Sequence, residues 1–435
     1  MNNEQKILNY YASWSISQAL TFMFLVPFAV FLGLTNIQIG IVSAMPYASL
    51  ILSQITTLFF SEKVCNRKKF VLTLSFITRL FLIPLLVLPF VSNAPVYFII
   101  LIFLLYFVGE IASPALMSII ADFVPEKIRG RFFARKNIYI AQFTTIPYLL
   151  AGFFLDIFPK NSPTGFIMLF AMGAVISFFS LTFIASIKEP EYKPVRENFS
   201  DVFKFRGEYG KFTLFMTVFS FAYMIASPFF VVYLLKNLGL GYSYFVLATS
   251  ISTACRVIFS KPIGKILDKY GDKPVAIVST FATALVPLTY LFFVSPQNVW
   301  LIIPAEIISG IAWAGFDLST VNLLLDFTTK EDRIMQIAKF NIVTAVPMII
   351  APIIAGYLSE NVLFIWAGIP LLFALSAILR VVAAPLLFSI KEERAKKEYP
   401  VRTILREYYH MPMRTLRTAE RGLVAFVHHK ETKSS

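Results

Sequence analysis

Charged residues, cysteines and histidines are all scarce in this chain. Charged residues make up 15% of the 435 residues and hydrophobic residues 57%, whereas soluble domains carry about 25% charged residues. This composition excludes a soluble protein of two or three domains. The two cysteines, Cys65 and Cys255, support neither a disulfide framework nor a thiolate metal site.

Sequence features of enzymes are also missing. The three histidines, at positions 410, 428 and 429, all lie in the last 26 residues, so no metal cluster and no nucleophile–base set is predicted. No segment resembles a nucleotide-binding P-loop, which argues against ATP as a direct energy source. We therefore expect neither an enzyme nor a protein with a cofactor or a bound metal.

Long apolar runs fill the space between the few charged segments. Each run is about 20 residues long, the length that crosses roughly 30 Å of hydrocarbon as an α-helix. The sequence predicts an all-α membrane protein with twelve transmembrane helices. The predicted spans lie near residues 12–34, 38–60, 70–91, 96–121, 136–158, 165–187, 213–236, 243–264, 274–294, 298–325, 336–358 and 363–389. They divide the chain into a six-helix bundle (1–187), a linker (188–212), a second six-helix bundle (213–389) and a basic tail (390–435).

The basic residues are distributed unevenly between the loops. The loops after spans two, four and eight carry four or five Lys and Arg residues each, whereas the opposite side has only Lys160 and Lys236. The positive-inside rule then places both termini and the linker in the cytoplasm of a cell whose plasma membrane holds the protein. The net charge of +14 follows this pattern and does not indicate a nucleic-acid partner.

A long-period repeat relates the two halves. Residues 121–156 align with residues 325–360 at an offset of 204, with ten identities in 36 positions. The best-matched part is the charged stretch 121–137, ADFVPEKIRGRFFARKN, which we expect to form a hinge between spans four and five. Its partner, residues 325–341, takes the same place between spans ten and eleven.

These features resemble the secondary transporters of the major facilitator superfamily, in particular permeases of the prokaryotic type. The loop between spans eight and nine is similar to the G-x-x-x-D-x-x-G-x-K motif of that family, with Gly264, Asp268, Gly271 and Lys273 in place. The first half keeps only a degraded copy, from Glu62 to Lys69. The resemblance implies two bundles that rock about a central site.

The resemblance also implies a cytoplasmic gate at these loops. An acid there can accept backbone N–H groups at a neighbouring helix N-terminus, and such bonds would latch one conformation. The alternative is ordinary positive-inside topology with incidental ion pairs. The expected gate residues are Asp122, Arg129, Arg131, Asp268, Gly271, Lys273, Asp326 and Arg333.

Six charged residues lie well inside the predicted spans, away from the span ends: Arg79, Glu110, Arg256, Glu306, Asp317 and Arg380. A charge at the bilayer centre costs at least about 2.5–3.5 kcal/mol, so each should face a cavity or a partner. In the family architecture, spans one, four, seven and ten line the central cavity, which gives Glu110 and Asp317 equivalent places in opposite halves. We expect one of the two to carry a coupling proton and the other to help bind substrate.

Other interpretations of these charges remain open. Glu110 could form a structural pair with Arg79, and Asp317 with Arg256. Arg256 could instead bind an anionic substrate, while Arg380 is expected to be structural. The full set of candidate proton-coupling or substrate-binding residues is Glu110, Asp317, Glu306, Arg256, Trp313, Tyr106 and Gln18.

The predicted function is secondary transport of a small solute, driven by protons or another coupling ion. The many phenylalanines favour export of a lipophilic or amphiphilic compound. A proton-coupled importer of a sugar or organic ion is one alternative, and a non-transporting sensor or scaffold is another. Leu105 stands where drug–proton antiporters carry an arginine in span four, a departure from that mechanism. The sequence does not determine the oligomeric state.

The basic tail has two possible interpretations. Apolar residues recur every three or four positions from Val401, with arginines between them. This pattern is typical of an amphipathic helix on the cytoplasmic leaflet. The alternative is a solvated chain.

Overall fold

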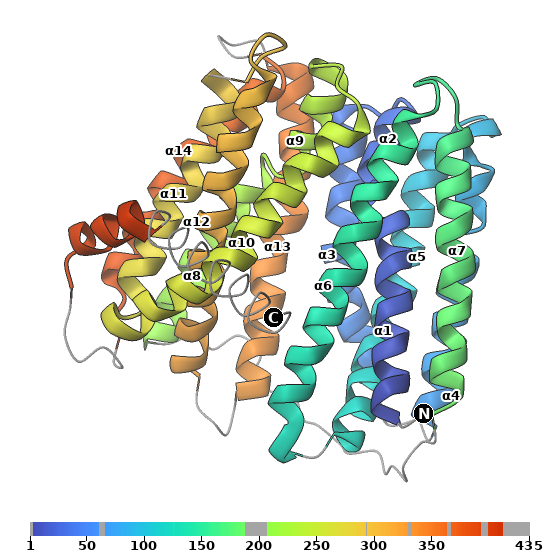
Figure 1. Cartoon of the computed structure of the whole chain (residues 1–435), viewed down its shortest axis with the longest axis horizontal. Helices are drawn as coiled ribbons and strands as arrows, with labels where there is room; N and C mark the ends of the chain where they lie inside the picture. Colours follow the sequence, from blue (N-terminus) through green and yellow to red (C-terminus); the bar gives the residue numbers. More distant parts are fainter. Residues whose placement is uncertain are drawn as a thin grey trace, which may run out of the picture. The chain divides into compact units, whose positions relative to one another are not determined.

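The computed structural model describes residues 3–60, 66–124, 126–187, 207–292, 294–328, 333–362, 367–392 and 399–411. Twelve helices in these ranges are long and apolar enough to cross a membrane, and the described residues contain no strand. The predicted all-α fold with twelve spans is thus confirmed (Figure 1). Cys65, most of the linker and the tail after Met411 lie outside the described residues.

The first six spans comprise α1 to α7. Their bounds are α1 Asn3–Leu20, α2 Leu25–Phe31, α3 Asn36–Phe60, α4 Arg67–Leu80, α5 Ala94–Phe123, α6 Glu126–Asp156 and α7 Thr164–Ala185. Span one is therefore two helices, joined by a 3-10 turn at Phe22–Phe24. Pro27 lacks the N–H that would bond to the carbonyl of Met23 and crowds that carbonyl, so the helix is interrupted there.

The last six spans comprise α8 to α14. Their bounds are α8 Gly207–Met224, α9 Phe229–Val232, α10 Tyr242–Tyr270, α11 Asp272–Phe292, α12 Ile302–Asp326, α13 Arg333–Asn361 and α14 Ile369–Ala383. A π-helical turn, Tyr233–Asn237, follows α9. Span seven is interrupted four residues before Pro228, as span one is before Pro27. Both spans are thus interrupted close to a proline.

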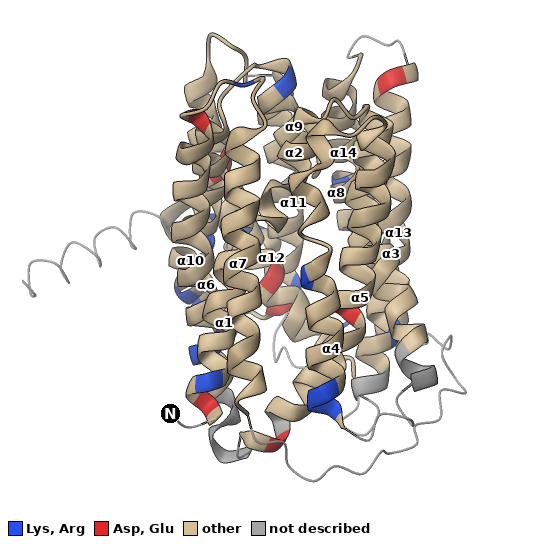
Figure 2. Cartoon of the chain, turned by 90° about the vertical axis from the view of Figure 1, so that its right-hand side faces the viewer, with Lys and Arg blue, Asp and Glu red and all other residues tan. Residues whose placement is uncertain are grey.

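The charged hinge is shorter than expected. Helix α5 continues to Phe123 and α6 begins at Glu126, so only two residues separate them. The charged residues 126–137 form the first three turns of α6 and extend that span beyond its apolar part. Figure 2 shows that many charged residues lie near the helix ends, and few lie along the middles of the helices.

The chain folds into two compact units whose boundaries differ from those of the two sequence halves. One unit contains residues 1–202, 223–250 and 342–372, and the other contains residues 203–222, 251–341 and 373–435. The first unit thus unites the six spans of the first half with α9, the beginning of α10, most of α13 and the start of α14.

Two contacts within this first unit hold helices of different halves together. The Asp156 carboxylate, at the end of α6, accepts the N–H groups of Tyr242 (2.7 Å) and Ser243 (2.9 Å) at the start of α10. The Glu360 carboxylate, near the end of α13, accepts the N–H groups of Asn36 and Ile37 at the start of α3. Each acid therefore caps the N-terminus of a neighbouring helix, where unpaired N–H groups and the helix dipole favour a negative charge.

A glycine lies one turn before each of these acids, on the same face of its helix. A Cβ atom on Gly152 would collide with the side chain of Val246 in α10, and one on Gly356 would collide with the carbonyl of Asn36 in α3. The absence of a side chain lets the partner helix approach closely enough for capping. We call each glycine–acid set, Gly152 with Asp156 and Gly356 with Glu360, a clasp.

Candidate functional site

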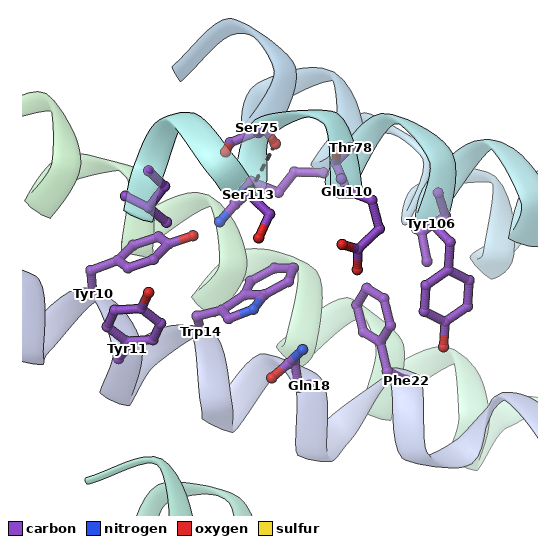
Figure 3. Close-up of a pocket in the computed structure, with 15 residues that line it drawn as sticks. Tyr10, Tyr11, Trp14, Gln18, Phe22, Ser75, Thr78, Tyr106, Glu110 and Ser113 are labelled. Atoms are coloured by element: carbon purple, nitrogen blue, oxygen red, sulfur yellow. Dashed lines mark hydrogen bonds between the residues drawn. The ribbon is translucent and has the colours of Figure 1, made fainter. Parts of the chain in front are cut away.

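A cavity of about 200 Å³ lies among helices α1, α4 and α5 of the first unit (Figure 3). Predicted residues Gln18, Tyr106 and Glu110 all line it. Its lining residues are Tyr10, Tyr11, Trp14, Gln18, Phe22, Ser75, Thr78, Arg79, Leu105, Tyr106, Gly109, Glu110, Ala112, Ser113 and Leu116. The cavity therefore combines an aromatic wall with one acid and one base.

The acid of this cavity, Glu110, has no hydrogen-bond or ion-pair partner within the part of the chain that the structure describes. Glu110 projects from the middle of α5, and its carboxyl group points toward α1, over the space between Trp14 and Phe22 (Figure 3). Among the residues that the structure describes, no hydrogen bond or ion pair reaches this carboxylate. Glu110 therefore remains available to a proton or to a group that enters the cavity.

The basic residue of the cavity, Arg79, is hydrogen-bonded to other residues of the protein. Arg79 is 2% exposed, and its Nε and Nη1 donate to the carbonyls of Ser177 (2.9 Å) and Ser75 (2.8 Å). Its guanidinium also lies 4.6 Å from the centre of the Trp14 ring. These neutral partners disperse the charge of Arg79, and the structure contains no ion pair between Arg79 and Glu110 among its described residues.

Aromatic rings form the opposite wall. Phe22 contacts Trp14 and Tyr106 edge-on, with 5.6 Å between ring centres in both cases. Tyr10 and Tyr11 continue the wall along α1. Trp14 and the two tyrosines were not predicted as site residues. Tyr10 and Tyr11 lie before the expected start of the first span near residue 12, whereas Trp14 lies inside that span. Their spacing with Gln18 and Phe22 places them along one side of a helix, and this signal could have identified them.

The second half presents a different arrangement of charges. Asp317 on α12 forms an ion pair with Arg256 on α10, which is the structural pairing considered above. Glu306 lies closer to the start of α12 and accepts a hydrogen bond from the Tyr290 hydroxyl of α11 at 2.8 Å. Trp313 packs against Phe219 and Phe316, with ring centres 6.1 and 5.4 Å away. The two acids expected at equivalent places thus have different surroundings.

The other predicted intramembrane base, Arg380, is 3% exposed. Its Nη1 donates to the carbonyl of Thr283 at 2.7 Å, and its Nε to the hydroxyl of Ser376 at 3.1 Å. Like Arg79, it ties its helix to neighbouring backbone through neutral oxygens.

The expected gate residue Asp122 has a partner at the start of α4. Arg67 donates to Asp122 at 2.6 Å and to the Ser118 hydroxyl at 2.7 Å. The equivalent place in the second half carries another bond between a third and a fourth span, in which Asn322 donates to Asp272 at 2.8 Å. Arg67 and Asp272 were not predicted as gate residues. Arg67 lies in the degraded copy of the loop motif and Asp272 in the intact copy, and neither stands at a position that the motif specifies.

The remaining gate residues are more dispersed. Asp268 is exposed at the end of α10, and the glycine of the motif, Gly271, adopts a φ of 89° between α10 and α11. The N–H of Lys273 donates to Glu392 at 2.9 Å. Asp326 is exposed at the end of α12. The side chains of Arg129, Arg131 and Arg333 lie outside the described residues.

Comparison with known proteins identifies the family. The sequence profile of the Major Facilitator Superfamily matches residues 7–212 and again residues 212–428. A stretch of 119 residues is 30% identical to the class H tetracycline resistance protein of Pasteurella multocida, covering 27% of this chain and 28% of that protein. A stretch of 134 residues is 25% identical to the uncharacterized MFS-type transporter YqjV of Bacillus subtilis (strain 168), covering 31% and 32%. The matches thus span about a third of these relatives' length or less.

Solved transporters share the fold. The nucleoside transporter NupG superposes with a TM-score of 0.66 at 16% identity, covering 89% of this chain and 98% of that one. A D-xylose-proton symporter superposes with a TM-score of 0.65 at 16% identity, covering 91% and 98%. The match of the family profile to both halves shows that the chain belongs to the Major Facilitator Superfamily, and its twelve apolar helices make it a multi-pass membrane protein.

Proposed function

We propose that the protein is a proton-coupled transporter that binds an amphiphilic solute in the cavity of α1, α4 and α5. One observation carries this proposal: the Glu110 carboxylate faces an aromatic-lined cavity and has no partner among the described residues. An unpaired charge at this depth is unfavourable. Glu110 is therefore neutral with a proton bound, or is compensated by a group of the solute.

The rest of the cavity suits the proposed solute. Rings of Trp14, Phe22 and Tyr106 offer apolar surface, and Gln18 and Ser113 offer hydrogen-bonding groups beside it. A small number of polar groups in a mainly apolar cavity orients a ligand that is itself part apolar and part polar. Sugar binding would require more polar side chains than this wall supplies.

The direction proposed is export across the plasma membrane, with both termini in the cytoplasm. The short match to a tetracycline resistance protein supports export, and the excess of Lys and Arg in alternate loops supports the orientation. Proton-driven import of an organic ion is the alternative. It is compatible with a cavity that holds both Glu110 and Arg79.

The decisive experiment measures solute-dependent proton movement in proteoliposomes. A pH-sensitive dye inside the vesicles reports whether tetracycline, other lipophilic compounds, nucleosides or sugars move protons through the wild-type protein. Tetracycline or another lipophilic compound is expected to give a signal in the direction of exchange. If only a sugar or nucleoside does so, the importer alternative replaces the proposal. If no compound is transported and none causes proton movement, the alternative of a non-transporting sensor or scaffold is favoured.

A further inference from the structure

The chain continues beyond its last span into a helix that belongs to neither six-helix bundle. Residues 401–411 are helical and appear in dark red in Figure 1. Ile404 is fully buried and Met411 is 4% exposed, and the two residues share one face with Tyr408. This inner face rests on the second unit of the protein.

The inner face occupies a groove between three helices. Ile404 and Met411 belong to one apolar cluster with Phe259 and Ile263 of α10 and with Val278 of α11. Val275 of α11 and Ala314 of α12 are further buried members of this cluster. The helix is thus docked on the bundle by its own apolar residues, as a core element would be.

Tyr408 anchors the helix between α11 and α12. Its hydroxyl lies 3.0 Å from the Ser279 hydroxyl, and it occupies space that a side chain at Gly315 would need. Burial raises the pKa of Tyr408 to about 12, so the phenol stays protonated and can donate a hydrogen bond. Gly315 therefore has a packing role, since any larger residue would displace this ring.

Polar contacts fix both the approach to the helix and its middle. The Glu392 carboxylate accepts the N–H groups of Asp272 (2.8 Å) and Lys273 (2.9 Å) at the start of α11. The Tyr270 hydroxyl donates to Glu407 at 3.0 Å, and the Tyr270 ring packs edge-on against Tyr399. The helix 401–411 is therefore held in one orientation about its axis.

This orientation exposes a second, chemically different face. Leu405 and Tyr409 are 54% and 81% exposed, and Arg402, Arg406 and His410 are exposed beside them. These five positions follow the spacing of one helix face. An apolar residue and an aromatic ring flanked by arginines are typical of helices that lie at the boundary between headgroups and acyl chains.

The position of the helix places this outer face close to the membrane surface. Ser279, beside the Tyr408 hydroxyl, lies seven residues after the start of α11, which is about 10 Å along a helix axis at 1.5 Å per residue. Interfacial helices lie roughly 5–10 Å into the headgroup–acyl boundary. The docked helix is thus at a depth where phospholipid headgroups surround the ends of the spans.

We propose that the outer face of residues 401–411 binds anionic phospholipid headgroups of the adjacent leaflet. Arg402 and Arg406 supply the complementary charge, while Leu405 and Tyr409 enter the boundary between headgroups and acyl chains. Because the inner face is bound to α10, α11 and α12, lipid composition would act directly on these helices. The proposal is independent of which solute the protein transports.

The magnitude expected follows from the two arginines. Each Lys or Arg near an anionic surface contributes about 1 kcal/mol, which corresponds to about fivefold in an equilibrium constant. Removing both charges is therefore expected to weaken membrane contact of the helix by about 30-fold. Added salt should weaken it as well, because screening shortens the range of surface electrostatics.

Spin labelling of the full-length protein tests this directly. A nitroxide is attached at Tyr409→Cys in a background where Cys65 and Cys255 are serine. The protein is reconstituted into vesicles of pure phosphatidylcholine, or of phosphatidylcholine with a quarter of phosphatidylglycerol. The accessibility of the label to oxygen and to a water-soluble nickel chelate then reports its depth.

The label is expected to be membrane-immersed in phosphatidylglycerol vesicles and more accessible to the chelate in pure phosphatidylcholine. The Arg402→Gln/Arg406→Gln variant should lose this difference, and the charge-preserving Arg402→Lys/Arg406→Lys variant should keep it. A second label at Leu405→Cys guards against a local effect of the first. If both labels are equally water-accessible in the two membranes, the outer face is solvated and the proposal is wrong. Equal immersion in both membranes would leave no role for the anionic lipid and would also overturn it.

Discussion

Asp156 and Glu360 stand 204 residues apart at aligned positions of the repeat, and each caps the first turn of a helix from the other half. Asp156 caps α10, and Glu360 caps α3. Both acids follow a glycine by four residues, so each clasp has the same two parts. The clasps join odd spans to even spans on the side of the membrane opposite to the start of α1.

Removing both capping acids should loosen that side of the protein. Replacing a capping acid by alanine costs about 1 kcal/mol, so Asp156→Ala/Glu360→Ala should favour separation of the clasped helices by about 30-fold. Distances between spin labels near the end of α6 and the start of α10 would report the change. The matched control is Asp156→Asn/Glu360→Gln, since Asn caps helices about as well as Asp. Equal distance distributions for the alanine variant and the wild type would show that the caps do not control opening.

Neutralising the cavity acid should abolish proton coupling. Glu110→Gln keeps the shape of the side chain but cannot release a proton, so pH-driven transport should fall to the level of protein-free vesicles. Exchange of solute at equal pH on both sides should persist, because it needs no net proton movement. Flux of labelled solute under both conditions separates the two effects.

Two controls sharpen this prediction. Glu110→Asp should retain pH-driven transport, since it keeps a titratable group. Glu306→Gln changes a carboxylate that is bonded to Tyr290 and should reduce transport less than Glu110→Gln does. Intact pH-driven transport in a Glu110→Gln/Asp317→Asn double variant would exclude both acids as proton carriers.

The Arg256–Asp317 pair should contribute little to stability. Half of the Arg256 side chain and 31% of Asp317 are exposed. We expect this surface to face a water-filled cavity, where an ion pair is worth about 0–1 kcal/mol. Asp317→Asn and Arg256→Gln are each expected to lower the melting temperature by no more than a few degrees. Thermal unfolding in detergent, with the double variant completing a mutant cycle, measures the coupling. A strongly non-additive cycle would mean that the pair is shielded more than the exposed fractions imply.

Arg79 should matter for stability more than for selectivity. Its bonds to two serine carbonyls and its contact with Trp14 tie α4 to α7 and α1. Hydrogen bonds to charged groups contribute about 1.5–3 kcal/mol, so Arg79→Met should lower the melting temperature by roughly 5–10 °C. Thermal unfolding and a solute-competition profile would be measured on the same sample. Unchanged stability with altered selectivity would instead assign Arg79 to solute binding.

The spans were predictable because hydrocarbon thickness imposes a length on each apolar run. Glu110 and Gln18 could be predicted to line a cavity because a polar side chain inside a span is unfavourable in contact with hydrocarbon. The partners of these residues could not be predicted. Arg79 donates to serine carbonyls, whereas Arg256 forms an ion pair with Asp317. This difference depends on how the helices rotate and pack, which a single sequence does not specify.

Helix ends were the least predictable part. Asp156 and Glu360 look like ordinary loop acids, and their capping role depends on a helix start that lies 86 or 324 residues away in the chain. The packing of the inner face of residues 401–411 against α10, α11 and α12 could not be predicted either. An amphipathic pattern does not show whether the apolar side of a helix contacts lipid or protein. Arg67 was interpreted as part of a basic loop, although its partner Asp122 was already a candidate.

The two clasps have a consequence for how such a protein could have originated. Each half supplies one helix end that carries a capping acid and one helix start that is capped. The first half therefore caps a helix of the second, and the second half caps a helix of the first in the same way. A pair of identical six-helix chains related by a twofold axis would form both contacts from a single set of residues, as an isologous dimer does. The clasp therefore needs no specialisation of either half, and could predate the fusion of two copies into one chain.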